Sequence, residues 1–286
     1  MSVGVASPPL TVQDAVSIAA RRLTGGGIAN AAGEAKELVA RALGGNRKTL
    51  DLRRDERWSL SSELILNAFL LQRLDHVPLA YLLGEWDFLD MTLTVTPDVL
   101  IPRPETEELF QWMAEDPRVE GVLADVGTGA GGLALAAARQ WPTARVMAID
   151  LSAAALAVAR WNARRHGVEE RIEFHRADLL EGVKGGSLDV VVANLPYVAT
   201  ADLAGLSPDV LKEPRRALDG GPDGLSVIHR LIPQAFEALR RDGRLFLEVG
   251  QGQAVAVGQA VTQAGFSDVS IVRDFAGIER FIRGTR

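Results

Sequence analysis

Apolar residues in the first third of the chain recur at helical spacing. Thr11 is expected to cap a first helix, whose apolar face is Val12, Ala15, Val16, Ala19 and Leu23. A second helical pattern covers residues 31–42, and the glycines at 25–27 and 44–45 end these two helices. A third helix follows Ser59 or Ser61, with an expected apolar face of Leu64, Ile65, Ala68, Phe69, Leu71 and Leu74. Residues 1–84 are therefore predicted to form a small all-helical domain, with a loose tail over residues 1–10.

The apolar period changes from helical spacing to strict alternation over residues 85–101. Trp86, Phe88, Met91, Leu93 and Val95 alternate with polar residues, which predicts a β-hairpin that links two domains. Prolines 102 and 104 stiffen the loop that follows, and helical spacing resumes over residues 107–113.

From residue 122 onward, apolar strand patterns alternate with helical ones. Strands are predicted at 122–126, 145–149, 172–175, 188–193, 244–249, 269–272 and 279–282, the last two as an antiparallel pair. Helices are predicted at 131–140, 152–166, 225–240 and 253–264. This alternation predicts an α/β domain over residues 102–286, with a mostly parallel sheet covered by helices on both faces.

The amino-acid composition disfavours several functional classes for this protein. The chain has 286 residues, 47% hydrophobic, and a net charge of -6, which disfavours a protein whose main task is to grip a nucleic acid backbone. It contains no cysteine, and its four histidines have no ligand spacing, so we expect no metal site. We also expect no membrane span and no signal peptide, hence a cytoplasmic enzyme.

A glycine loop joins the first strand of the α/β domain to its first helix. The residues are Gly127, Thr128, Gly129, Ala130 and Gly131, and Gly132 completes a G-x-G-x-x-G spacing. Asp150 ends the next strand, where a carboxylate can accept hydrogen bonds from both hydroxyls of a ribose. The loop and Asp150 together predict an adenosine-containing ligand, without deciding which one.

Asp125 indicates which class of adenosine-containing ligand the site binds. Its carboxylate precedes the glycines at a buried strand end, where it suits a cationic amino-acid tail and would repel a pyrophosphate. The loop also lacks the lysine of an ATP-binding P-loop. We infer S-adenosyl-L-methionine as cofactor and S-adenosyl-L-homocysteine as product. Asp178 is a candidate acceptor for the adenine amino group, and Leu179 a cover for the ring.

Asn194, Leu195, Pro196 and Tyr197 follow the fourth strand of the α/β domain, next to the first strand in this topology. The Asn194 side-chain oxygen and the Pro196 carbonyl can accept both hydrogens of an amide or amino group, and Tyr197 can stack on its plane. These residues predict methyl transfer to nitrogen, with Asn194, Pro196 and Tyr197 as the catalytic residues.

The chain resembles the protein-(glutamine-N5) methyltransferases that modify peptide chain release factors. The resemblance rests on motifs spread over nearly the whole length, at residues 78–84, 100–107, 125–131, 194–197, 213–214, 217–218, 220–221, 223–225, 248–250 and 253. It implies a Rossmann-like, seven-stranded methyltransferase fold behind a substrate-docking helical domain. It also implies a Gly-Gly-Gln glutamine as acceptor and a release factor as partner, with Arg103 and Glu105 added to residues 194–197 as substrate-binding residues. By position, the resemblance implies that Gly127 to Gly131, Asp150, Leu179 and Asn194 touch the cofactor.

One position departs from the family pattern. The usual motif is Asn-Pro-Pro-Tyr, and Leu195 stands in its second place, which is similar to the motif of ribosomal RNA adenine dimethylases. Two alternative functions therefore remain: an N6-adenine methyltransferase acting on RNA or DNA, and a nucleotide-binding protein without transferase activity. We prefer glutamine as the acceptor, because the sequence keeps Pro196.

Overall fold

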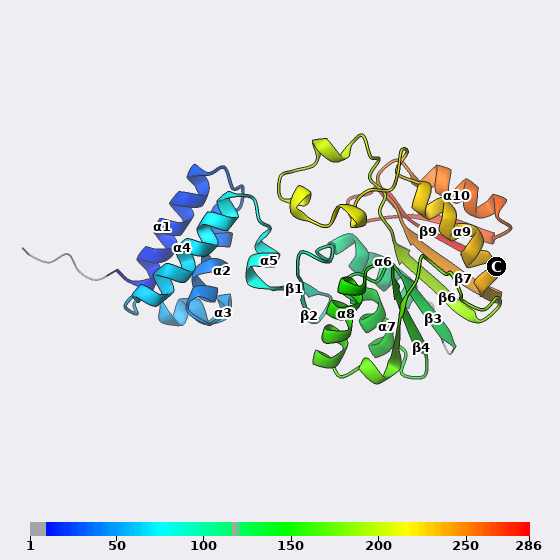
Figure 1. Ribbon diagram of the computed structural model, residues 1–286, viewed down its shortest axis with the longest axis horizontal. Helices are drawn as coiled ribbons and strands as arrows, with labels where there is room; N and C mark the ends of the chain where they lie inside the picture. The colour runs from blue at the N-terminus through cyan, green and yellow to red at the C-terminus, as the bar shows by residue number, and fades with distance from the viewer. Residues whose placement is uncertain (1–9, 116–118, 120) are drawn as a thin grey trace, which may run out of the picture. The chain divides into compact units, whose positions relative to one another are not determined.

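The computed structural model of the protein describes residues 10–115, 119 and 121–286 (Figure 1). The chain divides into two compact units, with the boundary between Gly84 and Glu85. The tail expected over residues 1–10 lies outside the described residues except for Leu10. The two units are described separately below.

The first unit is helical. Its elements are α1 (Val12–Gly25), α2 (Ala31–Ala42), α3 (Arg47–Leu50), the 3-10 helix η1 (Asp51–Arg53), α4 (Leu60–Leu74) and α5 (Leu79–Leu83). Thr11 caps α1 in a reciprocal capping box with Asp14, and the buried residues of α1 are the five predicted from its spacing. Helices α1 and α2 pack against each other and against α4, so one small core holds the unit together.

The prediction for the buried face of α4 was wrong for most of its residues, although Phe69 and Leu74 do pack against the core. The helix buries Ser62, Leu66, Leu70 and Arg73. Leu64 and Leu71, which were expected inside, are 65% and 66% exposed. Almost every face of this helix carries leucine, so the hydrophobic pattern could not select one. The buried ion pair between Arg73 and Glu34 of α2 fixes the observed face, because a buried charge needs its partner.

The second unit is an α/β domain. It begins with an antiparallel hairpin of β1 (Glu85–Phe88) and β2 (Met91–Thr94), as predicted, and the hairpin buries Phe88 and Met91 within the unit. The main sheet comprises β3 (Val122–Val126), β4 (Arg145–Asp150), β5 (Ile172–Arg176), β6 (Leu188–Asn194), β7 (Leu239–Glu248), β8 (Ser267–Arg273) and β9 (Glu279–Thr285). The helices are α6 (Pro104–Ala114), α7 (Gly132–Gln140), α8 (Ala153–Arg165), α9 (Ser226–Ala238) and α10 (Ala254–Gln263).

The seven-stranded sheet has the order β5-β4-β3-β6-β7-β9-β8. Strands β5 to β7 in this order are parallel, and β9 and β8 are antiparallel, which confirms the predicted fold. The strand order reverses between β3 and β6, and parallel sheets place ligands at such a switch point, beside the carboxyl ends of the strands. Asp125 of β3 and Asn194 of β6 both lie there.

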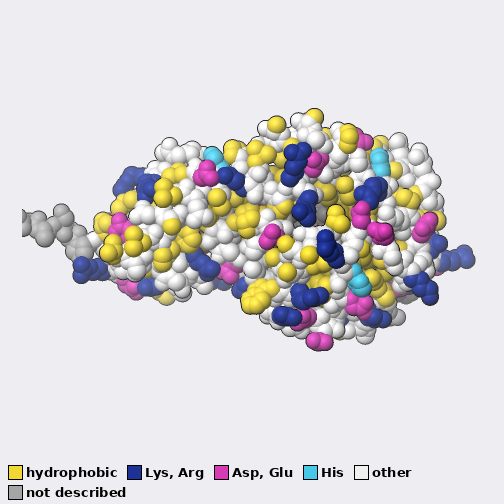
Figure 2. Space-filling model, viewed as in Figure 1, with side chains coloured by type: hydrophobic (Ala, Val, Ile, Leu, Met, Phe, Trp, Pro, Cys, Tyr) yellow, Lys and Arg dark blue, Asp and Glu magenta, His cyan; other side chains and the backbone are white. Residues whose placement is uncertain are grey.

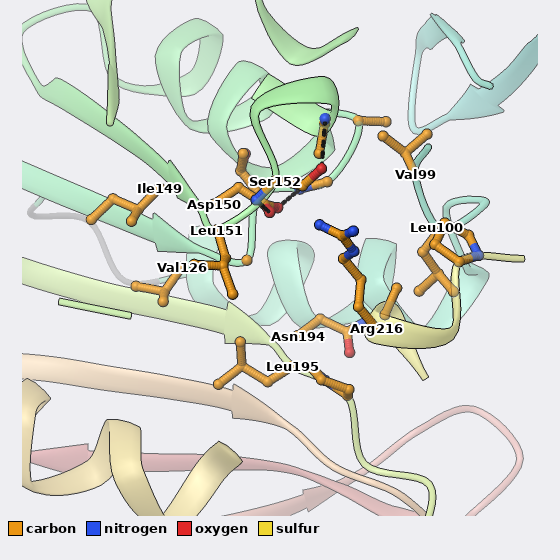
Figure 3. A pocket seen from close by; sticks show the side chains of 18 of the residues that line it. Val99, Leu100, Val126, Ile149, Asp150, Leu151, Ser152, Asn194, Leu195 and Arg216 are labelled. Carbon is orange, nitrogen blue, oxygen red and sulfur yellow. Dashed lines mark hydrogen bonds between the residues drawn. The ribbon is translucent and has the colours of Figure 1, made fainter. Parts of the chain in front are cut away.

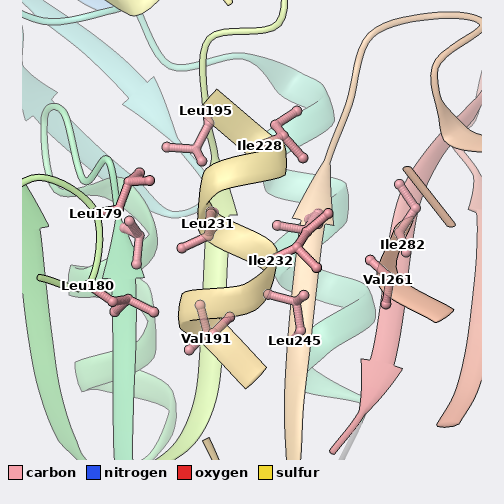
Figure 4. Packing of buried hydrophobic residues seen from close by; sticks show 14 of the residues in the cluster. Leu179, Leu180, Val191, Leu195, Ile228, Leu231, Ile232, Leu245, Val261 and Ile282 are labelled. Atoms are coloured by element: carbon pink, nitrogen blue, oxygen red, sulfur yellow. The ribbon is translucent and has the colours of Figure 1, made fainter. Parts of the chain in front are cut away.

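Helices cover the sheet in two groups. Helices α6, α7 and α8 pack on one another and on strands β3, β4, β5 and β7, while α9 and α10 pack together and on β7, β8 and β9. Figure 4 shows how Ile228, Leu231 and Ile232 of α9 face Val191 of β6 and Leu245 of β7. This apolar contact holds the β6 end, and with it Asn194, against the rest of the core.

Two boundaries and one connection differ from the predictions. Helix α6 begins at Pro104 and not at Glu107, because proline suits the first helical position, where no N–H is needed. Strand β7 starts at Leu239, earlier than the predicted Arg244. Between β6 and α9, where no element was predicted, lie three 3-10 helices: η3 (Leu203–Gly205), η4 (Val210–Lys212) and η5 (Arg215–Ala217).

Candidate active site

A cavity of about 830 Å³ opens at the carboxyl ends of β3, β4 and β6. This volume is typical of small-molecule sites. Figure 3 shows Asp150 and Ser152 on one side of the cavity and Asn194 and Leu195 on another. Segments far apart in the sequence thus supply the two halves of one site.

The glycine loop lines this cavity and requires glycine at three positions. Gly127, Gly129 and Gly131 have φ angles of 78°, 54° and 89°, in the left-handed region that side chains disfavour. A Cβ at Gly127 would also stand 2.9 Å from the Leu195 side chain. The loop therefore packs directly against the segment that follows β6.

Backbone groups of the glycine loop are largely bonded within the protein. The N–H groups of Gly127 and Thr128 donate to the Ile149 carbonyl, and that of Gly131 donates to the Thr128 carbonyl. The N–H of Gly129 donates to Asp150. A dinucleotide pyrophosphate is held by free loop N–H groups, and few remain here.

Asp125 occupies the position where a helix N-terminus would otherwise bind an anion. Its Oδ2 accepts hydrogen bonds from the Thr128 hydroxyl (2.7 Å) and from the N–H of Ala134 in the first turn of α7 (3.0 Å). Burial raises the pKa of Asp125 to about 7, although these two hydrogen bonds act in the opposite direction. A buried acid with a raised pKa is stabilised by a cation, so the site suits an ammonium or sulfonium better than a phosphate.

Asp150 ends β4 with its carboxylate oriented by the backbone. Oδ1 accepts from the N–H of Ser152 (2.8 Å) and Oδ2 from the N–H of Gly129 (3.0 Å). Each oxygen keeps a further lone pair, so the fixed carboxylate can accept from two neighbouring hydroxyls. Burial raises the pKa of Asp150, while these backbone hydrogen bonds lower it.

Asp178 and Leu179 line the cavity beyond Asp150. The Asp178 carboxylate is already paired with Arg230 of α9, Oδ2 to Nη2 at 2.6 Å, which leaves one oxygen for a ligand. Leu179 is buried and has a φ of 55°, an uncommon conformation for a side chain of this kind. Their assignment to the adenine ring stays a prediction.

Asn194 has a defined amide orientation. Its Nδ2 donates to the Thr106 hydroxyl (2.8 Å), and that hydroxyl donates to Oε2 of Glu248 (2.8 Å). No donor among the described residues reaches the Asn194 Oδ1, which is thus left to accept. The sequence placed Thr106 and Glu248 in motifs, but their hydrogen bonds span 88 and 142 positions and could not be read from spacing.

The carbonyl of Pro196 also has no donor among the described residues, and it lies beside Gly220. A Cβ at Gly220 would come within 2.7 Å of the Pro196 oxygen and 2.4 Å of the Gly224 oxygen. The glycine therefore permits the close approach of two backbone segments at the site.

We expect Gly220→Ala to displace the Pro196 carbonyl and to lower kcat by roughly a hundredfold, because a small misplacement of reacting groups has an effect of this size. Turnover at saturating cofactor and cofactor affinity would be measured together. Gly205→Ala is the matched control, since a Cβ there meets nothing within 4 Å. Equal kcat values in the two variants would contradict this role of Gly220.

Leu195 and Tyr197 flank these acceptors. Leu195 is buried, and its side chain joins the core beside Ile228 of α9, so it replaces the family's proline with a packed residue (Figure 4). Tyr197 does not line the cavity. Its carbonyl accepts from Nε2 of Gln253 (2.9 Å), and burial raises the pKa of its phenol. Stacking of Tyr197 on a substrate amide stays a prediction.

Arg103 lines the cavity, whereas Glu105 does not. Arg103 pairs with the buried Glu213, whose other oxygen accepts from the N–H of Ile101 (3.0 Å). Glu213 thus ties the loop before α6 to the segment that carries Arg216. Arg216 was not predicted from the sequence; its side chain extends into the cavity and electrostatically favours the charged form of Asp150 (Figure 3).

Two features are absent from the residues that the structure describes. No group of three or more His, Cys, Asp or Glu side chains among them could hold a metal ion. None of their helices combines the length and the apolar character that a membrane crossing needs.

Two family profiles match the chain. The Methyltransferase small domain matches residues 105–274, and the PrmC N-terminal domain matches residues 14–84. The first match covers more than half of the chain and includes the glycine loop, Asp150 and residues 194–197.

Curated relatives match over nearly the full length. The release factor glutamine methyltransferase of Moorella thermoacetica is 40% identical over 95% of this chain and 97% of that protein. The protein of the same name in Geobacter sulfurreducens is 37% identical over 90% of each chain. That of Caulobacter vibrioides is 34% identical over 97% of each chain.

Solved structures share the fold. A methyltransferase from Pyrococcus furiosus is 18% identical with a TM-score of 0.50, over 68% of this chain and 87% of that one. The hMettl16 catalytic domain, in complex with MAT2A 3'UTR hairpin 6, is 13% identical with a TM-score of 0.54, over 67% of this chain and 74% of that one. At these identities the likeness concerns the methyltransferase fold alone.

Proposed function

The chain belongs to the release factor glutamine methyltransferase family, and from this premise we propose that it methylates the side-chain amide nitrogen of a release factor glutamine. S-Adenosyl-L-methionine is the proposed methyl donor, and the glutamine of a Gly-Gly-Gln tripeptide is the proposed acceptor. The observation that carries the proposal is the oriented amide of Asn194 in the same cavity as Asp125 and Asp150.

The cavity fits this cofactor in three respects. Asp150 presents a backbone-oriented carboxylate for the ribose hydroxyls. Asp125 supplies a buried negative charge for the cationic amino-acid part. The N–H groups of Gly127, Thr128 and Gly129 are bonded within the protein, which disfavours a pyrophosphate and hence a dinucleotide.

The acceptor half of the cavity fits a primary amide. S-Adenosyl-L-methionine supplies a sulfonium-bound methyl group. The Asn194 Oδ1 and the Pro196 carbonyl accept the two amide hydrogens, which holds the nitrogen lone pair toward that methyl. Positive charge builds on the nitrogen during transfer, so both oxygens bind it more strongly in the transition state than in the ground state. The N–C bond would form as the S–C bond breaks, S-adenosyl-L-homocysteine would leave as product, and the nitrogen would lose its surplus proton to solvent afterwards, so the chain needs no general base for the transfer itself.

An exocyclic adenine amino group would also suit two acceptors, but the surface charge favours a protein acceptor. The net charge is -6. On the face shown in Figure 2, Lys and Arg side chains are interspersed with acidic ones and form no continuous basic stripe. A protein that follows a nucleic acid backbone usually carries such a stripe.

Mass spectrometry of a purified release factor tests the proposal. We expect one added methyl group on the glutamine of the tripeptide after incubation with enzyme and S-adenosyl-L-methionine. A release factor with that glutamine replaced by asparagine should gain none. Methylation of an RNA oligonucleotide, with no change in the release factor, would support the adenine alternative and refute the glutamine proposal.

We also propose that the helical unit docks the release factor. Helix α4 exposes Leu64 and Leu71, seven positions apart and hence on one face, and such unpaired apolar side chains often mark a protein contact. Leu64→Asp with Leu71→Asp should raise KM for the release factor about tenfold at unchanged kcat. Val255→Asp, on an exposed position of α10, is the control. An unchanged KM in the double variant would exclude this surface.

A further inference from the structure

Glu248 is a buried acid behind the site that the proposed reaction does not use directly. It ends β7, is 1% exposed, and accepts from the Thr106 hydroxyl with Oε2 only. Its other oxygen, Oε1, is buried and has no hydrogen-bond partner among the described residues. Burying a carboxylate with one oxygen unpaired costs folding free energy, which suggests that Glu248 has a role in the site.

The ionised form of Glu248 determines the direction of every hydrogen bond between it and the cavity. A carboxylate only accepts, so Thr106 must turn its hydrogen toward Glu248. The Thr106 oxygen then faces Asn194 with lone pairs, which can pair only with the amide NH2. The Asn194 Oδ1 is consequently directed to the other side, where an acceptor is required.

We propose that Glu248 is a positioning residue that acts through Thr106 to hold Asn194 with its oxygen toward the substrate nitrogen. The inference rests on the proposed function. It adds two residues to the methyl-transfer site, and it requires Glu248 to be ionised. A protonated Glu248 can donate to Thr106, and Thr106 can then donate to Asn194. This reversal turns the amide NH2 toward the substrate amide, where two donors would face each other.

Burial places the pKa of Glu248 near neutrality, and the neighbouring groups modify it. Burial raises its pKa to about 7, against the lowering effect of the Thr106 hydrogen bond and of Arg280 on β9. Glu105 of α6 raises the pKa and Arg103 lowers it, and the Tyr197 phenol lies close enough to be affected by Glu248 in turn. Because the ionised form is required, kcat should fall as the pH falls through about 7.

Thr106→Val and Thr106→Ser test the relay, with the release factor and S-adenosyl-L-methionine both saturating. Valine keeps the shape without the hydroxyl, and we expect kcat to fall about a hundredfold, an effect like that of losing one oriented hydrogen-bonding group at a reaction centre. Cofactor affinity and KM for the release factor should stay within about threefold of wild type. Serine restores the hydroxyl and should restore most of kcat.

The pH profile separates positioning from general damage. In the wild type and in Thr106→Ser, kcat should decline between about pH 8 and 6. Thr106→Val should show a low, flat profile, and Glu248→Gln a flat one, because its amide does not titrate. Asp125, whose pKa is also about 7, is intact in all four proteins, so it cannot account for a limb that two of them lose. A limb that persists in Thr106→Val, or a serine variant as slow as the valine variant, would overturn the proposal. Wild-type enzyme that leaves the release factor unmethylated would instead refute the proposed function.

Discussion

Replacing Asn194 with alanine is expected to lower kcat for methyl transfer by about a thousandfold while leaving the affinity for S-adenosyl-L-methionine within a few-fold of wild type. The reason is geometric. An amide nitrogen is a poor nucleophile, and Asn194 supplies one of the two acceptors that orient it. Asn194 lines the part of the cavity proposed for the substrate amide, whereas Asp125 and Asp150 line the part proposed for the cofactor.

Isothermal titration of the cofactor and single-turnover methylation of a release factor measure the two effects separately. Asn30→Ala is a suitable control, because Asn30 is exposed before α2 in the helical unit and its side chain makes no capping hydrogen bond there. Turnover of Asn194→Ala at the wild-type rate would remove Asn194 from the mechanism. A parallel loss of cofactor binding would instead assign it to the cofactor half of the site.

The fold was predictable because local patterns and global packing agree. The strands β3, β4 and β6 are apolar on both faces, helices α7 and α8 follow β3 and β4 at short intervals, and caps such as Thr11, Ser59 and Ser152 mark the helix starts. Prediction failed where pattern alone was ambiguous. The leucine-rich helix α4 had no unique apolar face, and the buried contact of Arg73 with Glu34, 39 positions away, could not be read from the pattern.

The candidate site was predictable to the extent that its residues stand at strand ends. Asp125, Asp150 and Asn194 could be placed from the chain because parallel strands bring their carboxyl ends to one edge. The hydrogen bonds and packing contacts that orient these residues could not be predicted from the sequence. Glu248 lies beside Asn194 because β6 and β7 pair in register, but Thr106 reaches both only through the crossing of α6 over β7. Gly220 meets Pro196 through a loop without a periodic pattern.

Asp150→Ala is expected to have the converse effect to Asn194→Ala. The substitution removes the two hydrogen bonds that the ribose would donate to the carboxylate, which weakens the free energy of binding by roughly 3 kcal/mol. The dissociation constant for S-adenosyl-L-methionine should therefore rise about a hundredfold. At saturating cofactor kcat should be largely retained, because Asp150 lies away from the acceptor nitrogen. Asp98→Ala is the matched control, since Asp98 lines the same cavity but bonds locally to Thr96.

Asp150 also holds the glycine loop through Gly129, so a loss of binding alone would not distinguish ribose recognition from loop damage. A comparison of S-adenosyl-L-homocysteine with its 2′-deoxyribose analogue makes the distinction. If Asp150 accepts from the ribose hydroxyls, wild type should prefer the hydroxylated ligand and Asp150→Ala should bind the two equally. If the carboxylate only braces the loop, the substitution weakens both ligands by the same factor and the preference remains, which would refute the ribose assignment.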